Sequence, residues 1–301
     1  MYQHHHISLL TENVTANKHF YTDVLGLRFI KNSVNQNNPH RRHIYYGDYV
    51  GTPGSVVTFF PVNFHSRQRV DGPSYFDGLA FNVSLESLDF WQHRLVNQFQ
   101  IAVVQAPNTL IFQDADNVPL RLQGVENPPR SRWTTNPKSD IPAQYQLLGI
   151  ATTTLVVRNQ AATERFFEQM FGLSAIDHVI TLNQYEHLLV QQSQTGDWLK
   201  WGPGSVDHYA LGVATSTLLD ALWERAAELG YQQEFRANRG YFESIYFREP
   251  SGLRIEVATN GPGFTLDESI ADLGTTLSLP GEFKTRRAEI TDYFARHGLL
   301  D

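Results

Sequence analysis

The stretch HHISLLTENVTANKHFYTDVLGL, residues 5–27, aligns without a gap with ATTTLVVRNQAATERFFEQMFGL, residues 151–173. Both copies carry an asparagine at the same place, Asn13 and Asn159, and both end in Gly-Leu. Each copy reads as an alternating strand followed by a helix with aromatic residues on its inner face. The glycine suits the left-handed residue that ends many helices. The repeat therefore predicts a β-α opening that occurs twice.

Two further segments follow the same plan, GLAFNVSLESLDFWQHRL from Gly78 and HYALGVATSTLLDALWERAAELGY from His208. Each of the four openings is followed by strand-like runs, which cover residues 42–46, 55–60, 110–113, 120–123, 177–183, 187–192, 243–247 and 253–258. The sequence therefore predicts four units of about βαβββ, a repeat architecture that has to be recognised before the fold can be assigned.

A stretch rich in proline and serine, residues 126–144, separates the second unit from the third and is the best candidate for a linker. We therefore expect an N-terminal pair of units over residues 1–140 and a C-terminal pair over residues 141–301. The second pair ends in an amphipathic helix from about Glu282 to Arg296. We interpret this helix as a cap without chemistry, packed through Phe283, Ile290, Phe294 and Leu299.

Composition excludes several classes of function. The chain has 301 residues, 41% of them hydrophobic, and its 24 Lys+Arg and 31 Asp+Glu give a net charge of −7. Its scattered basic residues make nucleic acid an improbable partner. Cysteine is absent, so histidines and carboxylates are the available metal ligands. No run approaches the ~18 apolar residues of a membrane span. We expect a cytoplasmic protein with a small-molecule partner, and a homo-oligomer remains open.

Four βαβββ units resemble the vicinal oxygen chelate superfamily over roughly residues 4–260. The resemblance implies an α+β fold in which paired units curl into two cup-shaped mixed-sheet barrels, one of them around a metal. A ligand in such a cup should lie on the first or last strand of a unit. On first strands His6 aligns with Thr152, and His208 aligns with Gly78. On last strands Glu256 aligns with Gln123.

Two histidines and one glutamate make up the facial triad of non-haem Fe(II) oxygenases. Glyoxalase-type relatives would use a second glutamate, which this sequence lacks. Simpler interpretations remain: Glu256 at a strand edge, His208 as a core histidine, and His4-His5-His6 as a tag remnant. Against a tag, the three histidines run directly into Ile7-Ser8-Leu9 without a linker. If all three ligands touch one ion, units one and four must share the metal cup.

Three longer blocks sharpen the resemblance: HHISLLTENVTANKHFYTDVLGLRFIKNSVNQ, HIYYGDYVGTPGSVVTFFP, and NRGYFESIYFREPSGLRIEVA followed by GPGF. They look like the hydroquinone ring-cleaving dioxygenases. That resemblance implies Fe(II) held by His6, His208 and Glu256, although a preparation can carry Mn(II) or Zn(II) instead. It implies that His5, Arg239 and Tyr246 act as catalytic groups close to the substrate. Asp207 and Phe242 are our candidates for binding the substrate.

Asp207 departs from the family, which often has a second histidine there, so Asp207 is a candidate to orient His208. Phe59, Phe242 and Phe247 are candidates to line an apolar slot, although a buried core is the more frequent place for phenylalanine. The implied reaction is extradiol-type cleavage of a 1,4-dihydroxybenzene with O2, which leaves both oxygen atoms in the product. Two other classes fit the same scaffold: a glyoxalase-like isomerase or thiol transferase with another metal, and a metal-free protein that binds aromatic compounds.

Overall fold

The computed structural model describes residues 2–35, 38–128, 130–279, 281–297 and 299. The first unit consists of β1 (Gln3–Thr11), α1 (Val14–His19), β2 (Arg28–Asn35), β3 (Asn38–Gly47) and β4 (Val56–Pro61). The second consists of β5 (Tyr75–Ser84), α2 (Leu88–His93), β6 (Val104–Ala106), β7 (Thr109–Gln113) and β8 (Pro119–Val125). In both units the helix continues as a π-helical turn, Phe20–Val24 or Arg94–Gln98.

The third unit consists of β9 (Ile150–Val157), α3 (Gln160–Phe171), β10 (Ala175–Ile176), β11 (Val179–Asn183) and β12 (Glu186–Gln192). The fourth consists of β13 (Val206–Val213), α4 (Ser216–Leu229), β14 (Gln232–Asn238), β15 (Phe242–Arg248) and β16 (Arg254–Pro262). The βαβββ plan is therefore confirmed in all four units.

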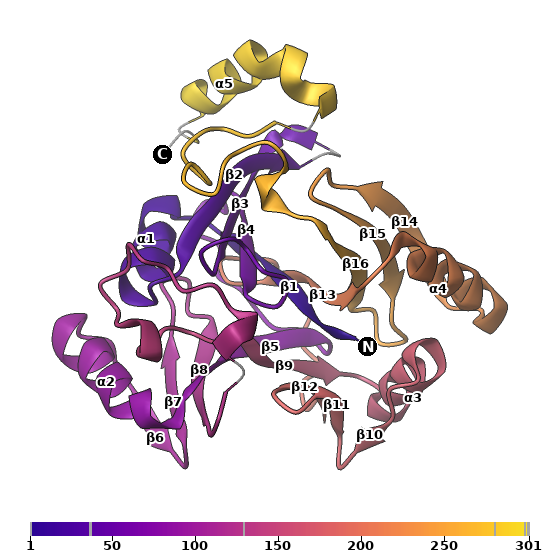
Figure 1. Ribbon diagram of the computed structural model, residues 1–301. Coiled ribbons are helices and arrows are strands. Elements are labelled where there is room, and N and C mark those ends of the chain that lie inside the picture. Colours follow the sequence, from indigo (N-terminus) through magenta and orange to yellow (C-terminus); the bar gives the residue numbers. More distant parts are fainter. Residues whose placement is uncertain (1, 36–37, 129, 280, 298, 300–301) are drawn as a thin grey trace.

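The strands form two eight-stranded mixed sheets, in the orders β14-β15-β16-β13-β1-β4-β3-β2 and β10-β11-β12-β9-β5-β8-β7-β6. The first sheet, called the 1/4 sheet below, joins the first and fourth units. The second, called the 2/3 sheet, joins the second and third (Figure 1). The predicted α+β fold of paired mixed sheets is confirmed. The pairing brings the beginning of the chain beside its last unit, because β1 runs antiparallel to β13.

The helices begin and end where the repeat predicts. The side chain of Asn13 accepts a hydrogen bond from the backbone of Ala16, and Asn159 does the same for Ala162, so both asparagines cap a helix. Gly26 and Gly172 have φ values of +71° and +69°, which glycine adopts without steric cost. The helices lie outside the sheets (Figure 1).

Two large apolar cores lie on the faces of the sheets that pack against helices. One joins residues of the first two units, such as Ile7, Phe59 and Phe81, and the other joins residues of the last two, such as Phe167 and Phe247. Phe59 and Phe247 belong to these cores, so the core is the correct one of the two alternatives for these residues and the slot is wrong for them. Strand alternation explains the error, because neighbouring residues of a strand face opposite sides of its sheet.

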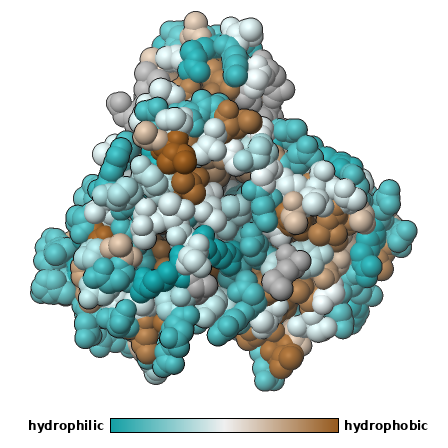
Figure 2. All heavy atoms as spheres, in the orientation of Figure 1, coloured by the Kyte–Doolittle hydropathy of each residue, from teal (hydrophilic) through white to brown (hydrophobic). Residues whose placement is uncertain are grey.

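The chain after β16 covers one end of the 1/4 sheet. A 3₁₀ turn, Gly281–Arg286, leads into α5, Arg287–Arg296, so the α-helix begins later than predicted. As predicted, Phe283, Ile290 and Phe294 are buried, and they pack with Val34 of β2. On the face in Figure 2, apolar side chains form separate spots among hydrophilic ones. Among the described residues, every helix is too short or too polar to cross a membrane.

Candidate metal centre

Three adjacent central strands of the 1/4 sheet carry the predicted ligands: His6 on β1, His208 on β13 and Glu256 on β16. Ala210 pairs with His6 on one side and with Glu256 on the other, so these residues share one face of the sheet. His208 lies two residues before Ala210 and therefore faces the same way. The methyl group of Ala210 is small enough to let the longer side chains meet in front of it.

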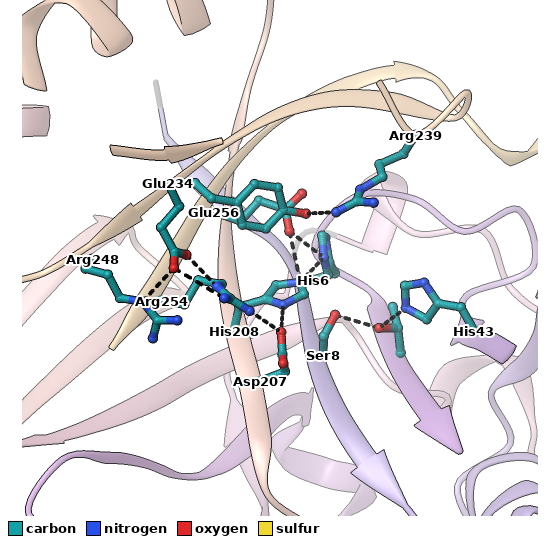
Figure 3. A network of polar contacts seen from close by, with 12 residues as sticks. His6, Ser8, His43, Asp207, His208, Glu234, Arg239, Arg248, Arg254 and Glu256 are labelled. Atoms are coloured by element: carbon teal, nitrogen blue, oxygen red, sulfur yellow. Dashed lines mark hydrogen bonds and ion pairs between the residues drawn. The ribbon is translucent and has the colours of Figure 1, made fainter. Parts of the chain in front are cut away.

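The ligand atoms of these three residues meet within hydrogen-bond range of one another (Figure 3). His208 Nε2 lies 2.9 Å from Glu256 Oε2, His6 Nε2 lies 3.3 Å from the same oxygen, and the two Nε2 atoms are 3.3 Å apart. Two ligand atoms that are each about 2.1 Å from one ion stand about 3.0 Å apart when they subtend a right angle. The observed separations therefore suit three ligands on one face of a single ion.

The hydrogen bonds behind the two histidines decide which nitrogen carries the proton. His208 Nδ1 lies 2.7 Å from Asp207 Oδ2, which can only accept, so His208 donates from Nδ1 and keeps a lone pair on Nε2. His5 Nε2 lies 3.0 Å from the carbonyl oxygen of Thr259, so His5 donates there and its Nδ1 is an acceptor. His6 Nδ1 lies 2.8 Å from His5 Nδ1 and must be the donor. His6 Nε2 therefore also carries a lone pair.

A β-bulge allows His5 and His6 to face each other. His4 pairs with Leu211 and His6 pairs with Ala210, so His5 is an extra residue in the ladder between β1 and β13. Both ring nitrogens of His5 are engaged, one by His6 and one by the backbone of Thr259. These contacts suit a residue that orients His6, whereas direct catalysis by His5 stays a prediction.

Two imidazole lone pairs and a carboxylate thus face one another in a buried space. Neither oxygen of Glu256 receives a hydrogen bond from the described residues, and the side chain is fully buried. A cation bound between these acceptors would compensate the cost of burying them together. Burial would raise the pKa of Glu256, but His6 and His208 hold it well below its usual range. Burial would lower the pKa of His208, but its hydrogen bond to Asp207 and the negative charge of Glu256 raise it. The residues present therefore fit a divalent metal ion.

Arg239 and Tyr246 lie beside this cluster, as predicted for groups close to a substrate. Tyr246 pairs with Glu256 across β15 and β16, and its ring meets that of His208 edge to face at 5.6 Å. Arg239 donates a hydrogen bond of 2.9 Å to the Tyr246 hydroxyl. Burial raises the pKa of Tyr246, so its phenol stays neutral and can donate a hydrogen bond. A fixed cation and a neutral phenol therefore adjoin the candidate metal ligands.

Phe242 and Asp207 occupy different surroundings. The Phe242 ring lies 4.9 Å from that of His5 and 5.5 Å from that of His6, and it belongs to a buried apolar cluster with Tyr45 and Phe264. This cluster gives the cup an apolar wall beside the ligands. Asp207 instead bonds His208 and lies 3.1 Å from Arg254 Nη1. These contacts favour the orienting role for Asp207, and its contact with substrate stays a prediction.

Sequence reasoning missed a second polar group on the same face of the 1/4 sheet, formed by Ser8, His43, Tyr45 and Thr58. His43 is buried within β3. The alternation of RHIYYG would have indicated it, because Ile44 and Tyr46 belong to the apolar core and His43 and Tyr45 must then face the cup.

A buried set of two histidines and one glutamate that could hold a metal ion, carried by a curled mixed sheet of repeated βαβββ units, defines the vicinal oxygen chelate class. Comparison with known proteins agrees. The profile of the Glyoxalase/Bleomycin resistance protein/Dioxygenase superfamily matches residues 149–257. "Putative ring-cleaving dioxygenase MhqE" of Bacillus subtilis is 31% identical over 303 residues, which cover 96% of each chain. The chain therefore belongs to this superfamily, with ring-cleaving dioxygenases among its full-length relatives.

Other relatives extend the comparison. Chlorohydroquinone/hydroquinone 1,2-dioxygenase of Sphingobium indicum is 24% identical, over 95% of this chain and 94% of that protein. A crystal structure described as a dioxygenase of Bacillus subtilis superposes with a TM-score of 0.85 at 26% identity, covering 97% of this chain and 96% of that one. Glyoxalase I from Zea mays shares the fold, with a TM-score of 0.58 at 12% identity over 86% of this chain and 93% of that one.

Proposed function

We propose that this protein is an Fe(II)-dependent dioxygenase that opens the ring of hydroquinones with O2. The observation that carries the proposal is the convergence of His6, His208 and Glu256, whose buried ligand atoms face one another. A facial set of two histidines and one carboxylate leaves further positions on the ion for substrate and dioxygen. Relatives named as ring-cleaving and hydroquinone dioxygenases support the choice of substrate.

The metal would be held by His6, His208 and Glu256, while Asp207 and His5 fix the ring orientation of the two histidines. When bound, Fe(II) brings a phenolate and dioxygen side by side and lets electrons pass from ring to oxygen. The reaction proposed is extradiol-type: a ring bond next to a hydroxylated carbon breaks, and both atoms of O2 enter the product.

The remaining roles fall to side chains around the ligands. Arg239 carries a positive charge in a site sheltered from water, where it would stabilise negative charge that develops on the substrate oxygen. Tyr246 would donate a hydrogen bond from its neutral phenol and return the proton after ring opening. Phe242 would hold the aromatic ring against His6 and keep water away from it.

The test is oxygen uptake after anaerobic loading with Fe(II), with methylhydroquinone, chlorohydroquinone and catechol as substrates. We expect uptake with the hydroquinones and its loss in His6→Ala. The matched control is His187→Ala, because His187 lies on β12 of the 2/3 sheet, where it pairs with Thr152. That variant should keep full activity. If the protein loaded with stoichiometric iron takes up no oxygen with any diphenol, the proposed dioxygenase function is wrong. An isomerase or transferase on the same scaffold is then the better proposal.

A further inference from the structure

Four buried side chains form an unbroken hydrogen-bonded chain beside the candidate metal centre, and Figure 3 shows two of them, Ser8 and His43. Ser8 Oγ lies 2.6 Å from Thr58 Oγ1, Thr58 Oγ1 lies 2.8 Å from His43 Nε2, and His43 Nδ1 lies 2.7 Å from the Tyr45 hydroxyl. All four residues are at most 8% exposed. We call this group the hydroxyl chain. Buried polar groups of this kind stabilise little on their own and need a reason to be kept.

The hydroxyl chain faces the same interior as the ligands. Ser8 lies two residues after His6 on β1 and pairs with His208 on β13, so its side chain shares their face. Thr58 pairs with Ser8 on one side and with Tyr45 on the other. At its far end, Tyr45 belongs to the apolar cluster that contains Phe242. The hydroxyl chain therefore runs along the wall of the cup from the metal ligands to the aromatic cluster.

Counting protons shows that the hydroxyl chain has one donor to spare. Burial, and next the charge of Arg239, hold the pKa of His43 well below its usual value, so its ring is neutral with one N–H. With three hydroxyl groups, the four residues carry four protons, but three hydrogen bonds join them. One hydroxyl proton has no acceptor among the described residues. It lies on Ser8 or on Tyr45, according to the direction in which the three hydrogen bonds donate. A buried donor without a partner favours an oxygen atom from a ligand.

We propose that the hydroxyl chain binds the second hydroxyl group of a 1,4-dihydroxybenzene whose first hydroxyl group meets the metal ligands. This inference rests on the proposed function and adds the basis of its substrate choice. The two oxygens of a 1,4-diol lie on opposite sides of the ring, so one ion cannot hold both. The neighbouring oxygens of a catechol can share an ion. A protein that selects hydroquinones therefore needs a polar group of its own across an apolar slot.

The test compares the dissociation constants of hydroquinone and phenol, which differ only in the second hydroxyl group, by calorimetry on the Fe(II)-loaded protein without O2. Thr58→Val breaks the hydroxyl chain in the middle and keeps the shape of the side chain. We expect it to weaken hydroquinone binding about five- to tenfold, the usual effect of losing one hydrogen bond, and to leave phenol binding unchanged. Tyr45→Phe is the second variant and should act in the same direction.

The matched control is Thr153→Val, the same change at a fully buried threonine of the 2/3 sheet, which should alter neither constant. Thermal unfolding checks that each variant is folded, and Tyr45→Phe provides the test if Thr58→Val is not. An unchanged ratio of the two constants in the folded variants would overturn the inference. If the wild type still consumes O2 with hydroquinone, the proposed function survives that result. A wild type that neither binds hydroquinone nor consumes O2 overturns both.

Discussion

The two eight-stranded sheets follow one plan, yet only the 1/4 sheet brings metal ligands together among the residues described. In the 1/4 sheet, Ala210 pairs with His6 in the neighbouring first strand. In the 2/3 sheet, Ala80 pairs with Thr152 in the same way. The ladder between first strands is therefore the same in both sheets. Because the backbone is repeated, the difference in function must come from side chains and from the last strand of each unit.

The last strands differ in register. Ala210 pairs with Glu256, whereas Ala80 pairs with Arg121. The sequence alignment matched Glu256 with Gln123, so β8 is offset by two residues from that alignment. An arginine thus lies where the other sheet has its carboxylate, and a fixed positive charge repels a metal ion. The same order of strands therefore forms with or without a metal site. A metal site also requires the register that places a carboxylate of the last strand beside the histidines.

The largest expected effect comes from removing the carboxylate of Glu256. Glu256→Gln keeps the size of the side chain but removes the charge that neutralises the ion. Residues that merely support ligands change metal affinity about ten- to a hundredfold, so we expect the loss of a direct ligand to exceed about a hundredfold. The measurement is the dissociation constant of Fe(II), or of Zn(II) as a stable substitute, by competition with a chelator.

The control for Glu256 is the residue at the same register in the other sheet. Arg121→Gln makes the side chain neutral at that position and should leave metal affinity unchanged. Equal losses in the two variants would contradict the assignment of the site to the 1/4 sheet.

A smaller effect is expected at Gly78, which occupies the place of His208 in the 2/3 sheet. Gly78 has a φ of +67°, and a Cβ there would lie 2.0 Å from the carbonyl oxygen of Pro119. Gly78→Ala should therefore lower the free energy of unfolding by about 2–4 kcal/mol, from overpacking together with the cost of positive φ. Urea denaturation measures it.

Gly230→Ala is the control for Gly78, because Gly230 also has positive φ but a Cβ there would meet no atom within 4 Å. It should cost about 1–2 kcal/mol, the price of the backbone conformation alone. Similar losses at the two glycines would show that the contact with Pro119 relaxes. A large loss at Gly78 alone would explain why the 2/3 sheet has no room for a ligand at this position.

Much of the fold could be predicted from the sequence. The parts that could not be predicted were missed for one common physical reason. The four strands absent from the predicted runs are β2, β6, β10 and β14, and each lies at the edge of a sheet. An edge strand pairs on one side only and is often exposed, so its residues carry little apolar periodicity. QQEFRAN of β14 is an example. The count of strands came from the repeat and not from hydropathy.

The candidate site shows the same division. His6, His208 and Glu256 could be predicted because repeat alignment compares equivalent positions. His43 could not be predicted in this way, since its part in the site depends on the pairing of Tyr45 with Thr58 and of Thr58 with Ser8. Contacts that depend on register between distant strands are absent from a single sequence.

The smallest expected effect compares a buried carboxylate of each half of the molecule. Glu256 is held ionised by histidines, whereas burial raises the pKa of Asp114, which follows β7, to about 6 from an ordinary value of 3.8. Folded protein thus holds this proton more tightly than the unfolded chain does. The stabilising contribution of Asp114 is complete below pH 3.8 and is lost as the pH rises through about 6.

Replacing Asp114 with a neutral amide should remove this loss. In Asp114→Asn, the side-chain oxygen can still accept the backbone hydrogen bonds from Asp116 and Val118. Relative to wild type, the variant should gain about 1–3 kcal/mol of unfolding free energy between pH 4 and pH 7.5, because each unit of pKa shift is worth about 1.4 kcal/mol. The measurement is urea denaturation at both pH values, with the exposed Asp220→Asn as control. A gain that is equal at both pH values would mean that Asp114 is ionised throughout, because its hydrogen bonds from Tyr21 and the backbone then offset burial.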